Sequence, residues 1–290
     1  MVDISVIIPS YNTKEITLRC LNILLDNLSV SSLSYEVIVV DNASKDGSQQ
    51  QISKLKSQNS NLKTIFNKKN IGFGAANNQA AKTAAGKFIL FLNSDVLVKG
   101  VDFSELVSYL EQNTDVGVLT VELIRPSGKR DLACHRGFPT LWRSLCYFTK
   151  LEQLFGNFPF LNRIFGGYHL TYLDKDIIQE IDSPSGAFYL VQSSLFKEVN
   201  GFDKEFFMYG EDLDLSFRIK EKGKKIVFYP KFKALHLKYQ SGLQKNDSET
   251  RTLMKKYFYD AMKIFYQKHY ADHYPDFFNS VVYFLIDLKT

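Results

Sequence analysis

The stretch Ile4-Ser5-Val6-Ile7-Ile8-Pro9-Ser10-Tyr11-Asn12 decides the fold of this 290-residue chain. It begins with a short, mainly apolar run that Pro9 stops, which is typical of a buried strand. Polar side chains follow immediately where that strand ends. The sequence therefore opens with a predicted buried strand whose carboxyl end carries groups able to contact a ligand.

Strand and helix patterns alternate after this stretch. Further apolar runs predict strands at residues 37–40, 62–66 and 88–92. Helices are predicted between them, around residues 18–28, 52–55 and 74–85. Strands that alternate with helices indicate parallel βαβ units, and hence a sheet covered by helices.

Polar clusters come directly after three of these strands. They are residues 9–12, Asp41-Asn42 and Asn93-Ser94-Asp95. Ligands of open α/β sheets bind beyond the carboxyl ends of the strands. The placement of the clusters predicts that the N-terminal half binds a ligand.

The second half has a different character. An aromatic, glycine-punctuated stretch covers residues 138–172, in which five apolar residues have the spacing of one helical face: Leu141, Leu145, Phe148, Leu151 and Phe155. That face suits ordinary core packing, or else a lid toward an acceptor or a membrane. Regular signals return as a strand at 187–191, a helix at 211–221 and a strand at 226–229, and a basic, aromatic helix is predicted from about residue 249.

Composition narrows the function classes. A net charge of +5 without a nucleic-acid-binding motif predicts no nucleic acid partner. The N-terminus lacks the pattern of a signal peptide, and no apolar run approaches the roughly 20 residues of a membrane helix. Cys20, Cys134 and Cys146 are odd in number and lack metal-ligand spacing, which favours a reducing, cytoplasmic compartment.

Three acidic or basic groups suggest chemistry. Asp95 at a strand end is well placed to hold a divalent cation, although such residues more often cap turns. In Glu211-Asp212, a carboxylate can take a proton from a hydroxyl. Asp214 and Arg218 form a predicted i,i+4 ion pair instead. His236 follows a strand, and by itself is more often a surface or core residue than a ligand.

Six motifs in order carry a family resemblance. They are SVIIPSYN (5–12), VVDNASKDGS (39–48), NIGFGAANN (70–78), FLNSD (91–95), SGAF (185–188) and GFDKEFFMYGED (201–212). With them, the chain resembles the GT-A-fold glycosyltransferases of family two, and within that family the bacterial rhamnosyltransferase-like branch. The resemblance spans about residues 5–236.

The resemblance implies a fold and its divisions. We expect a GT-A, Rossmann-like α/β domain over residues 1–240, with a mixed, mainly parallel central sheet flanked by helices. Its halves would be a nucleotide-binding half (1–100) and an acceptor and catalytic half (101–240) that carries a helical insertion at about 138–172. A C-terminal helical extension would cover residues 241–290.

The resemblance also implies roles for single residues. Asp212 is the expected catalytic base, and Asp95 and His236 are the expected ligands of a divalent metal, Mg²⁺ or Mn²⁺. The expected substrate-binding residues are Pro9, Tyr11, Asn12, Asp41, Gly72, Asn78, Asn93, Ser94, Gly186 and Glu211. The family's Asp-X-Asp motif has Asn93 in place of its first acid, which puts a metal role for that residue in doubt.

The expected function is an inverting, metal-dependent transfer of a sugar from a nucleoside diphosphate to a hydroxyl group. The branch suggests dTDP-rhamnose as the donor, with UDP-sugars as alternatives, and a growing cell-surface glycan, free or lipid-linked, as the acceptor. A dinucleotide-binding oxidoreductase is disfavoured because no Gly-X-Gly-X-X-Gly turn follows the first strand. A nucleotidyltransferase would need a glycine- and lysine-rich phosphate loop there. A non-catalytic sugar-binding protein remains the alternative.

The C-terminal extension has two interpretations. Lysines such as Lys255 and Lys263 alternate with aromatic residues, and the apolar run that follows is too short to span a bilayer. Such a segment can lie on the inner face of the plasma membrane as a peripheral contact. It can equally pack on the catalytic domain with its lysines in water.

Overall fold

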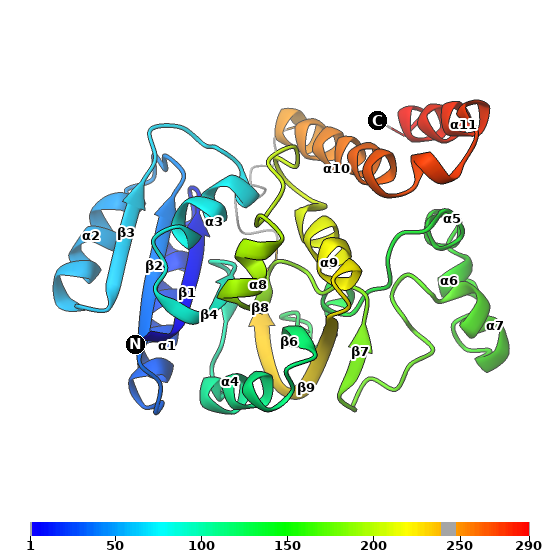
Figure 1. Ribbon diagram of the computed structural model, residues 1–290. Coiled ribbons are helices and arrows are strands. Elements are labelled where there is room, and N and C mark those ends of the chain that lie inside the picture. The colour runs from blue at the N-terminus through cyan, green and yellow to red at the C-terminus, as the bar shows by residue number, and fades with distance from the viewer. Residues whose placement is uncertain (1, 239–247, 290) are drawn as a thin grey trace.

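The computed structural model describes residues 2–238 and 248–289, which are arranged around a nine-stranded sheet (Figure 1). The expected boundary between residues 240 and 241 lies outside the described residues. The strands are β1 (Val2–Ser10), β2 (Tyr35–Asp41), β3 (Leu62–Phe66), β4 (Gly86–Leu92), β5 (Val96–Leu97), β6 (Val116–Ile124), β7 (Gln179–Ile181), β8 (Phe188–Gln192) and β9 (Lys225–His236).

The order of the strands confirms a mixed sheet. It runs β3-β2-β1-β4-β8-β6-β9-β5, and β7 also pairs with β9. The first four of these strands are mutually parallel. Strand β8 is antiparallel to both β4 and β6, whereas β6 and β9 are parallel. The N-terminal half is thus a parallel βαβ unit, as the alternating pattern predicted.

Helices cover both faces of this sheet. Figure 1 shows α3, α8 and α9 over the face turned to the viewer and α1 behind it. The α-helices are α1 (Lys14–Ser29), α2 (Ser48–Gln58), α3 (Phe73–Ala81), α4 (Phe103–Gln112), α5 (Leu141–Phe148), α6 (Leu151–Leu154), α7 (Pro159–Phe165), α8 (Ser193–Glu198), α9 (Glu211–Glu221), α10 (Ser248–His269) and α11 (Asp276–Asp287).

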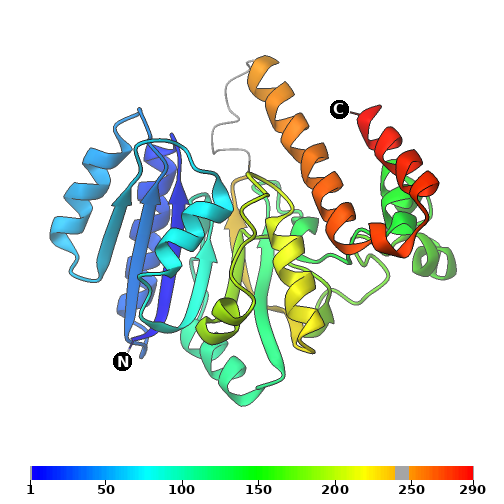
Figure 2. The same ribbon diagram turned by 45° about the horizontal axis from the view of Figure 1, so that its top comes forward.

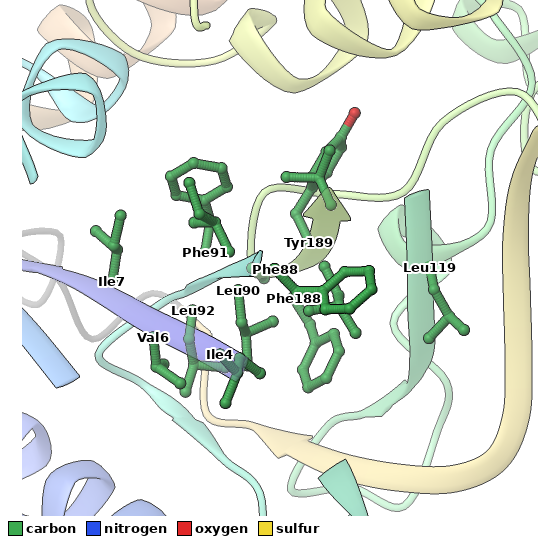
Figure 3. Packing of buried hydrophobic residues seen from close by; sticks show 14 of the residues in the cluster. Ile4, Val6, Ile7, Phe88, Leu90, Phe91, Leu92, Leu119, Phe188 and Tyr189 are labelled. Atoms are coloured by element: carbon green, nitrogen blue, oxygen red, sulfur yellow. The ribbon is translucent and has the colours of Figure 1, made fainter. Parts of the chain in front are cut away.

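The core lies between the sheet and these helices. Strand β1 is buried on both sides from Ile4 to Ile8, which explains its nearly continuous apolar run. Figure 3 shows side chains of β1, β4 and β8 meeting in this core, with Phe91 beside Tyr189. The rings of Phe91 and Phe202 meet edge-on at 4.8 Å between centroids, which fixes the loop before α9 on the sheet.

The expectation of one helical face at residues 141–155 is wrong. The chain forms two helices, because Lys150 adopts a left-handed conformation with φ 61° between α5 and α6. The following helix α7 folds back, and Trp142 of α5 donates a hydrogen bond to the carbonyl of Ile164. The aromatic stretch is a small helical subdomain instead of a single helix.

The C-terminal extension, called the tail below, contains two α-helices with different surroundings. Helix α10 packs on α9 and on the loop before it, because Ala261 and Phe265 form a buried cluster with Phe206 and Leu213. Helix α11 turns back beside the insertion, as Figure 2 shows, and keeps several apolar side chains in solvent. No helix of the described residues is long and apolar enough to cross a membrane.

Candidate functional site

The register of the sheet brings the predicted polar clusters to one edge. Ser10 at the end of β1 pairs with Asp41 at the end of β2. Residues 93–95 follow β4 on the other side of β1, and the N–H of Asn93 donates to the carbonyl of Ala187 at 3.0 Å. Parallel strands end at a common edge, so the three clusters lie along one rim.

Asp41 is the buried acid of this rim. One carboxylate oxygen, Oδ1, accepts hydrogen bonds from the Ser44 N–H at 2.9 Å and from the Gln49 amide at 2.7 Å. The other, Oδ2, is buried without a partner among the described residues. A buried acceptor without a donor is costly, so this oxygen is suited to an N–H group of a ligand.

Tyr11 and Asn12 lie on the solvent-facing side of this rim. Tyr11 is 37% exposed. The side-chain oxygen of Asn12 accepts a hydrogen bond from the backbone N–H of Lys45 at 2.8 Å, and the backbone N–H of Asn12 donates to the Ser44 hydroxyl. Asn12 therefore ties the loop after β1 to the loop after β2. Pro9 and Ser10 are the last two residues of β1.

Gly72 and Asn78 act through the loops they hold. Gly72 has φ 89°, and a Cβ there would lie 2.6 Å from the carbonyl oxygen of Phe207. The side-chain amide of Asn78 makes two hydrogen bonds to the backbone of Phe202. Its oxygen accepts from the Phe202 N–H at 2.9 Å, and its nitrogen donates to the Phe202 carbonyl at 2.7 Å. The close approach at Gly72 is thus to the protein's own backbone, and Asn78 fastens the loop at residues 201–203.

The two predicted metal ligands converge. Val96 of β5 pairs with His236 of β9, so the residue before β5, Asp95, faces the end of β9. The Asp95 Oδ1 atom lies 3.4 Å from the His236 Nε2 atom, and both side chains are buried. Of the neighbouring motif residues, Ser94 is buried, and the buried side-chain oxygen of Asn93 has no partner in the part of the chain that the structure describes.

Asp131 holds the imidazole of His236 from the other side. Its Oδ2 atom lies 2.8 Å from Nδ1 of His236, and its Oδ1 atom accepts from Lys238 at 2.8 Å. Burial alone would lower the pKa of His236, but its hydrogen bonds to Asp131 and Asp95 raise it. Burial opposes ionisation of Asp131, yet the bonds from His236 and Lys238 hold its pKa well below the ordinary range.

This arrangement fits a hard divalent cation whose coordination is completed by a bound phosphate-containing molecule. The described residues contain no group of three or more His, Cys, Asp or Glu side chains placed for a metal. Asp95 and His236 would supply two ligands, and phosphate oxygens or water would supply the others, as Mg²⁺ usually requires. Asp131 would fix the tautomer and orientation of the imidazole, the usual task of such an outer carboxylate.

Asp212 lies in a second cluster of charge, in the first turn of α9. Its Oδ2 atom accepts from the Arg136 guanidinium at 2.8 Å and from the Gly186 N–H at 2.9 Å. Among the described residues, its Oδ1 atom accepts one hydrogen bond, from the Leu213 N–H at 2.7 Å. Each carboxylate oxygen has two lone pairs, so Oδ1 can accept a second hydrogen bond from a further donor.

The acidic neighbours of Asp212 in the same helix differ in their contacts. Glu211 is buried, and its Oε2 atom has no partner among the described residues. Burial first, and then the negative charge of Asp212, raises the pKa of the Glu211 carboxyl. Asp214 forms the predicted pair with Arg218, at 2.6 Å, and also contacts His269 of α10 at 2.9 Å. Asp214 therefore anchors the tail.

Sequence reasoning missed Asp131 and Arg136. Both stand in an irregular segment between β6 and the insertion, with no strand end beside them. The single charged residue in Arg136-Gly137-Phe138-Pro139 was the available signal, since a charge beside glycine, an aromatic residue and proline suits a buried turn. Burial would lower the pKa of Arg136, but Asp212 and the hydroxyl of Tyr168 raise it.

Comparisons with known proteins show the family to which the chain belongs. A model of the family "Glycosyl transferase family 2" matches residues 5–176. The chain is 31% identical over 225 residues to the rhamnosyltransferase WbbL of Escherichia coli K12, covering 73% of this chain and 76% of that protein. It is 38% identical over 93 residues to a poly(ribitol-phosphate) beta-glucosyltransferase of Bacillus spizizenii, covering 32% of this chain and only 14% of that protein.

Solved structures share the fold at low identity. Residues 1–349 of S. aureus TarS, in complex with UDP-GlcNAc, align with a TM-score of 0.57 at 20% identity, covering 90% of this chain and 65% of that one. GalNAc-T7 with UDP, GalNAc and Mn²⁺ aligns with a TM-score of 0.63 at 15% identity, covering 91% and 47%. The GT-A fold expected from the sequence is thereby confirmed.

The first prediction concerns Asp131. We expect Asp131→Asn to weaken Mn²⁺ binding about 10- to 100-fold, the usual effect of removing an outer carboxylate from a histidine ligand. Asparagine keeps an acceptor oxygen for Nδ1, so the change tests the charge. Calorimetric titration of Mn²⁺ with UDP present measures the affinity. Asp176→Asn, at a side chain that is 88% exposed, is the control. Unchanged affinity in a folded Asp131→Asn variant would contradict this role.

The second prediction concerns Glu211. The unfolded chain releases the Glu211 proton near the ordinary pKa of 4.5, whereas the folded chain keeps it to higher pH. Wild-type stability therefore falls as pH rises above that value, and Glu211→Gln avoids this loss. We expect the Tm of Glu211→Gln minus that of wild type to increase from pH 5 to pH 8.

The control for this pH series is Glu15→Gln, because the Glu15 side chain is 81% exposed and meets water in both states. Its Tm difference from wild type should stay nearly constant. A flat Tm difference for Glu211→Gln as well would mean that the fold does not resist ionisation of Glu211.

Proposed function

Because the chain belongs to glycosyl transferase family 2, we propose that it is an inverting, metal-dependent glycosyltransferase. It moves a sugar from a nucleoside diphosphate to a hydroxyl of a growing cell-surface glycan. The observation that carries this proposal is the convergence of Asp95 and His236, far apart in the sequence, on the rim that also holds Asp41.

The nucleotide occupies the rim formed by the ends of β1 and β2. The Oδ2 atom of Asp41, buried without a donor, is suited to the ring N–H of uracil or thymine. Tyr11, partly exposed at the same rim, offers a surface for the base. Both features fit UDP and dTDP donors, and the similarity to a rhamnosyltransferase supports dTDP-rhamnose.

The diphosphate lies toward Asp95 and His236. A Mg²⁺ or Mn²⁺ ion held by these two residues would neutralise the charge that develops on the departing diphosphate. GalNAc-T7, which shares the fold, holds Mn²⁺ together with UDP. Asp131 keeps the imidazole oriented, so its Nε2 atom faces Asp95.

Asp212 takes the proton of the acceptor hydroxyl through its Oδ1 atom. The hydroxyl oxygen then attacks the anomeric carbon as the bond to the diphosphate breaks, from the opposite face, which inverts the configuration. Arg136 and the Gly186 N–H hold the other oxygen of the carboxylate, so Oδ1 has a fixed direction. No covalent intermediate between sugar and enzyme is needed.

The third prediction tests the base. Asp212→Asn removes the proton acceptor, so turnover should fall by roughly 10² or more while donor binding persists. Transfer from dTDP-rhamnose and from UDP-sugars measures turnover, and calorimetry with dTDP and UDP measures binding. Because the substitution also leaves Arg136 without its charged partner, the Tm of the variant must be recorded.

Near-normal turnover of Asp212→Asn would remove Asp212 from this role and make Glu211 the next candidate. Retained binding of dTDP or UDP by an inactive variant separates a lost base from a lost fold. Binding of neither nucleotide by the wild-type protein would contradict the proposed function itself.

We further propose that α11 makes a peripheral contact with a membrane. Its exposed apolar side chains include Phe277 at 74%, Phe284 at 61% and Leu288 at 65% exposure. The lysines of the tail contribute less than the sequence indicated, since Lys256 pairs with Asp260 and Lys268 with Glu205. Apolar insertion, more than charge, would supply the affinity.

The fourth prediction tests this contact by point substitution. Removing the whole tail would uncover the apolar cluster around Phe206, so we prefer the triple variant Phe277→Ser, Phe284→Ser, Leu288→Ser. Co-sedimentation with phosphatidylglycerol vesicles should fall severalfold. The control removes exposed apolar side chains elsewhere, at Val30, Ile177 and Ile178. Equal sedimentation of both variants would leave α11 a purely structural element.

A further inference from the structure

An apolar cavity of about 490 Å³ lies between the insertion and the tail. Its walls come from α5, the start of α9, α10 and α11, and they are aliphatic or aromatic almost throughout. Phe148, Tyr168, Leu213, Phe258, Phe265 and Val282 are representative. A volume in this range is typical of sites for small ligands.

The cavity adjoins the first turn of α9, the turn that carries the candidate base. Gly210 and Leu213, which line it, stand on either side of Glu211-Asp212 in the chain. Tyr168, another lining residue, interacts with Arg136, which in turn donates to Asp212. A ligand in the cavity would therefore place its attached group near the carboxylate that accepts the proton.

We propose that this cavity binds the hydrocarbon chain of an amphiphilic acceptor. The inference rests on the proposed function, because the chain would bring a hydroxyl-bearing head group to Asp212. The volume suits one slender chain and is too small for a helix about 10 Å across. The nearly unbroken apolar lining excludes the sugar itself as occupant, since its hydroxyls would lack partners there.

The surroundings of the cavity favour entry from a lipid surface. Leu145 on α5 and Val281 and Leu285 on α11 line the cavity and are each about half exposed, at 50%, 51% and 56%. Figure 2 shows α11 lying beside the helices of the insertion, and these three residues belong to the two facing elements. Lys289 lines the cavity as well and is exposed, so a cation is available for an anionic head group such as a phosphate.

The fifth prediction uses two probes with chains of the same length. Dodecyl phosphate and farnesyl phosphate, which share a main chain of twelve carbons while farnesyl adds three methyl branches, are titrated below their aggregation concentrations. Each should bind with one saturable site, and the tighter of the two identifies a preference for an unbranched alkyl or an isoprenoid chain. Affinity should rise about fourfold per methylene from octyl to dodecyl phosphate, the expected gain for burying apolar surface. Inorganic phosphate should not bind at this site.

Val282→Trp fills the cavity and should weaken dodecyl phosphate binding at least tenfold. Val30→Trp, at a site that is 84% exposed and remote from the cavity, is the matched control. Ser144→Phe fills the same cavity from α5 and serves if Val282→Trp does not fold. Calorimetry with dTDP and UDP in every variant reports the donor site separately.

These measurements distinguish the two proposals. Donor binding without saturable chain binding by the wild-type protein overturns the cavity assignment and leaves the glycosyltransferase intact. Chain binding without donor binding overturns the proposed function instead. Chain binding that neither filling variant weakens would place the chain elsewhere and overturn the assignment.

Discussion

Burying a charged side chain costs free energy unless an opposite charge lies beside it. The candidate site contains two buried carboxylates that are each stabilised in this way. The buried carboxylate of Asp131 joins His236 and Lys238, and the buried carboxylate of Asp212 joins Arg136. Each pair links elements that are distant in sequence. Removing Arg136 would leave the Asp212 carboxylate buried without its charged partner, and removing Asp131 would leave the buried imidazole of His236 without its partner on Nδ1, so the two clusters fix the loops of the candidate site.

The long strand β9 makes the first of these clusters possible. It pairs with β6, β7 and β5, and its end delivers His236 to Asp95. Its register against β6 shifts where Tyr229 and Lys233 face the successive residues Val121 and Glu122. Such a bulge re-aims the strand beyond it. A slip of one residue would turn the imidazole to the opposite face of the sheet.

The second cluster connects the candidate base to the appended helices. Arg136 precedes the insertion and interacts with Tyr168 within it, and Asp214 in the same helix as Asp212 contacts His269 of α10. The tail and the insertion thus rest on the helix that carries the candidate base. An acceptor held between them would be oriented by the same elements that orient Asp212.

The sequence by itself determined the alternating strands and helices and the polar residues at the strand ends. Local patterns were sufficient for these, because burial on both faces leaves a continuous apolar run and proline or asparagine ends it. Motif order also indicated Asp95, His236 and Asp212. Tertiary structure alone decided that Asn78 fastens a loop, that the insertion breaks at Lys150, and that Asp131 and Arg136 hold the site. The reason is that a buried charge is specified by its partner, and these partners are brought together only by strand register and by the packing of distant loops.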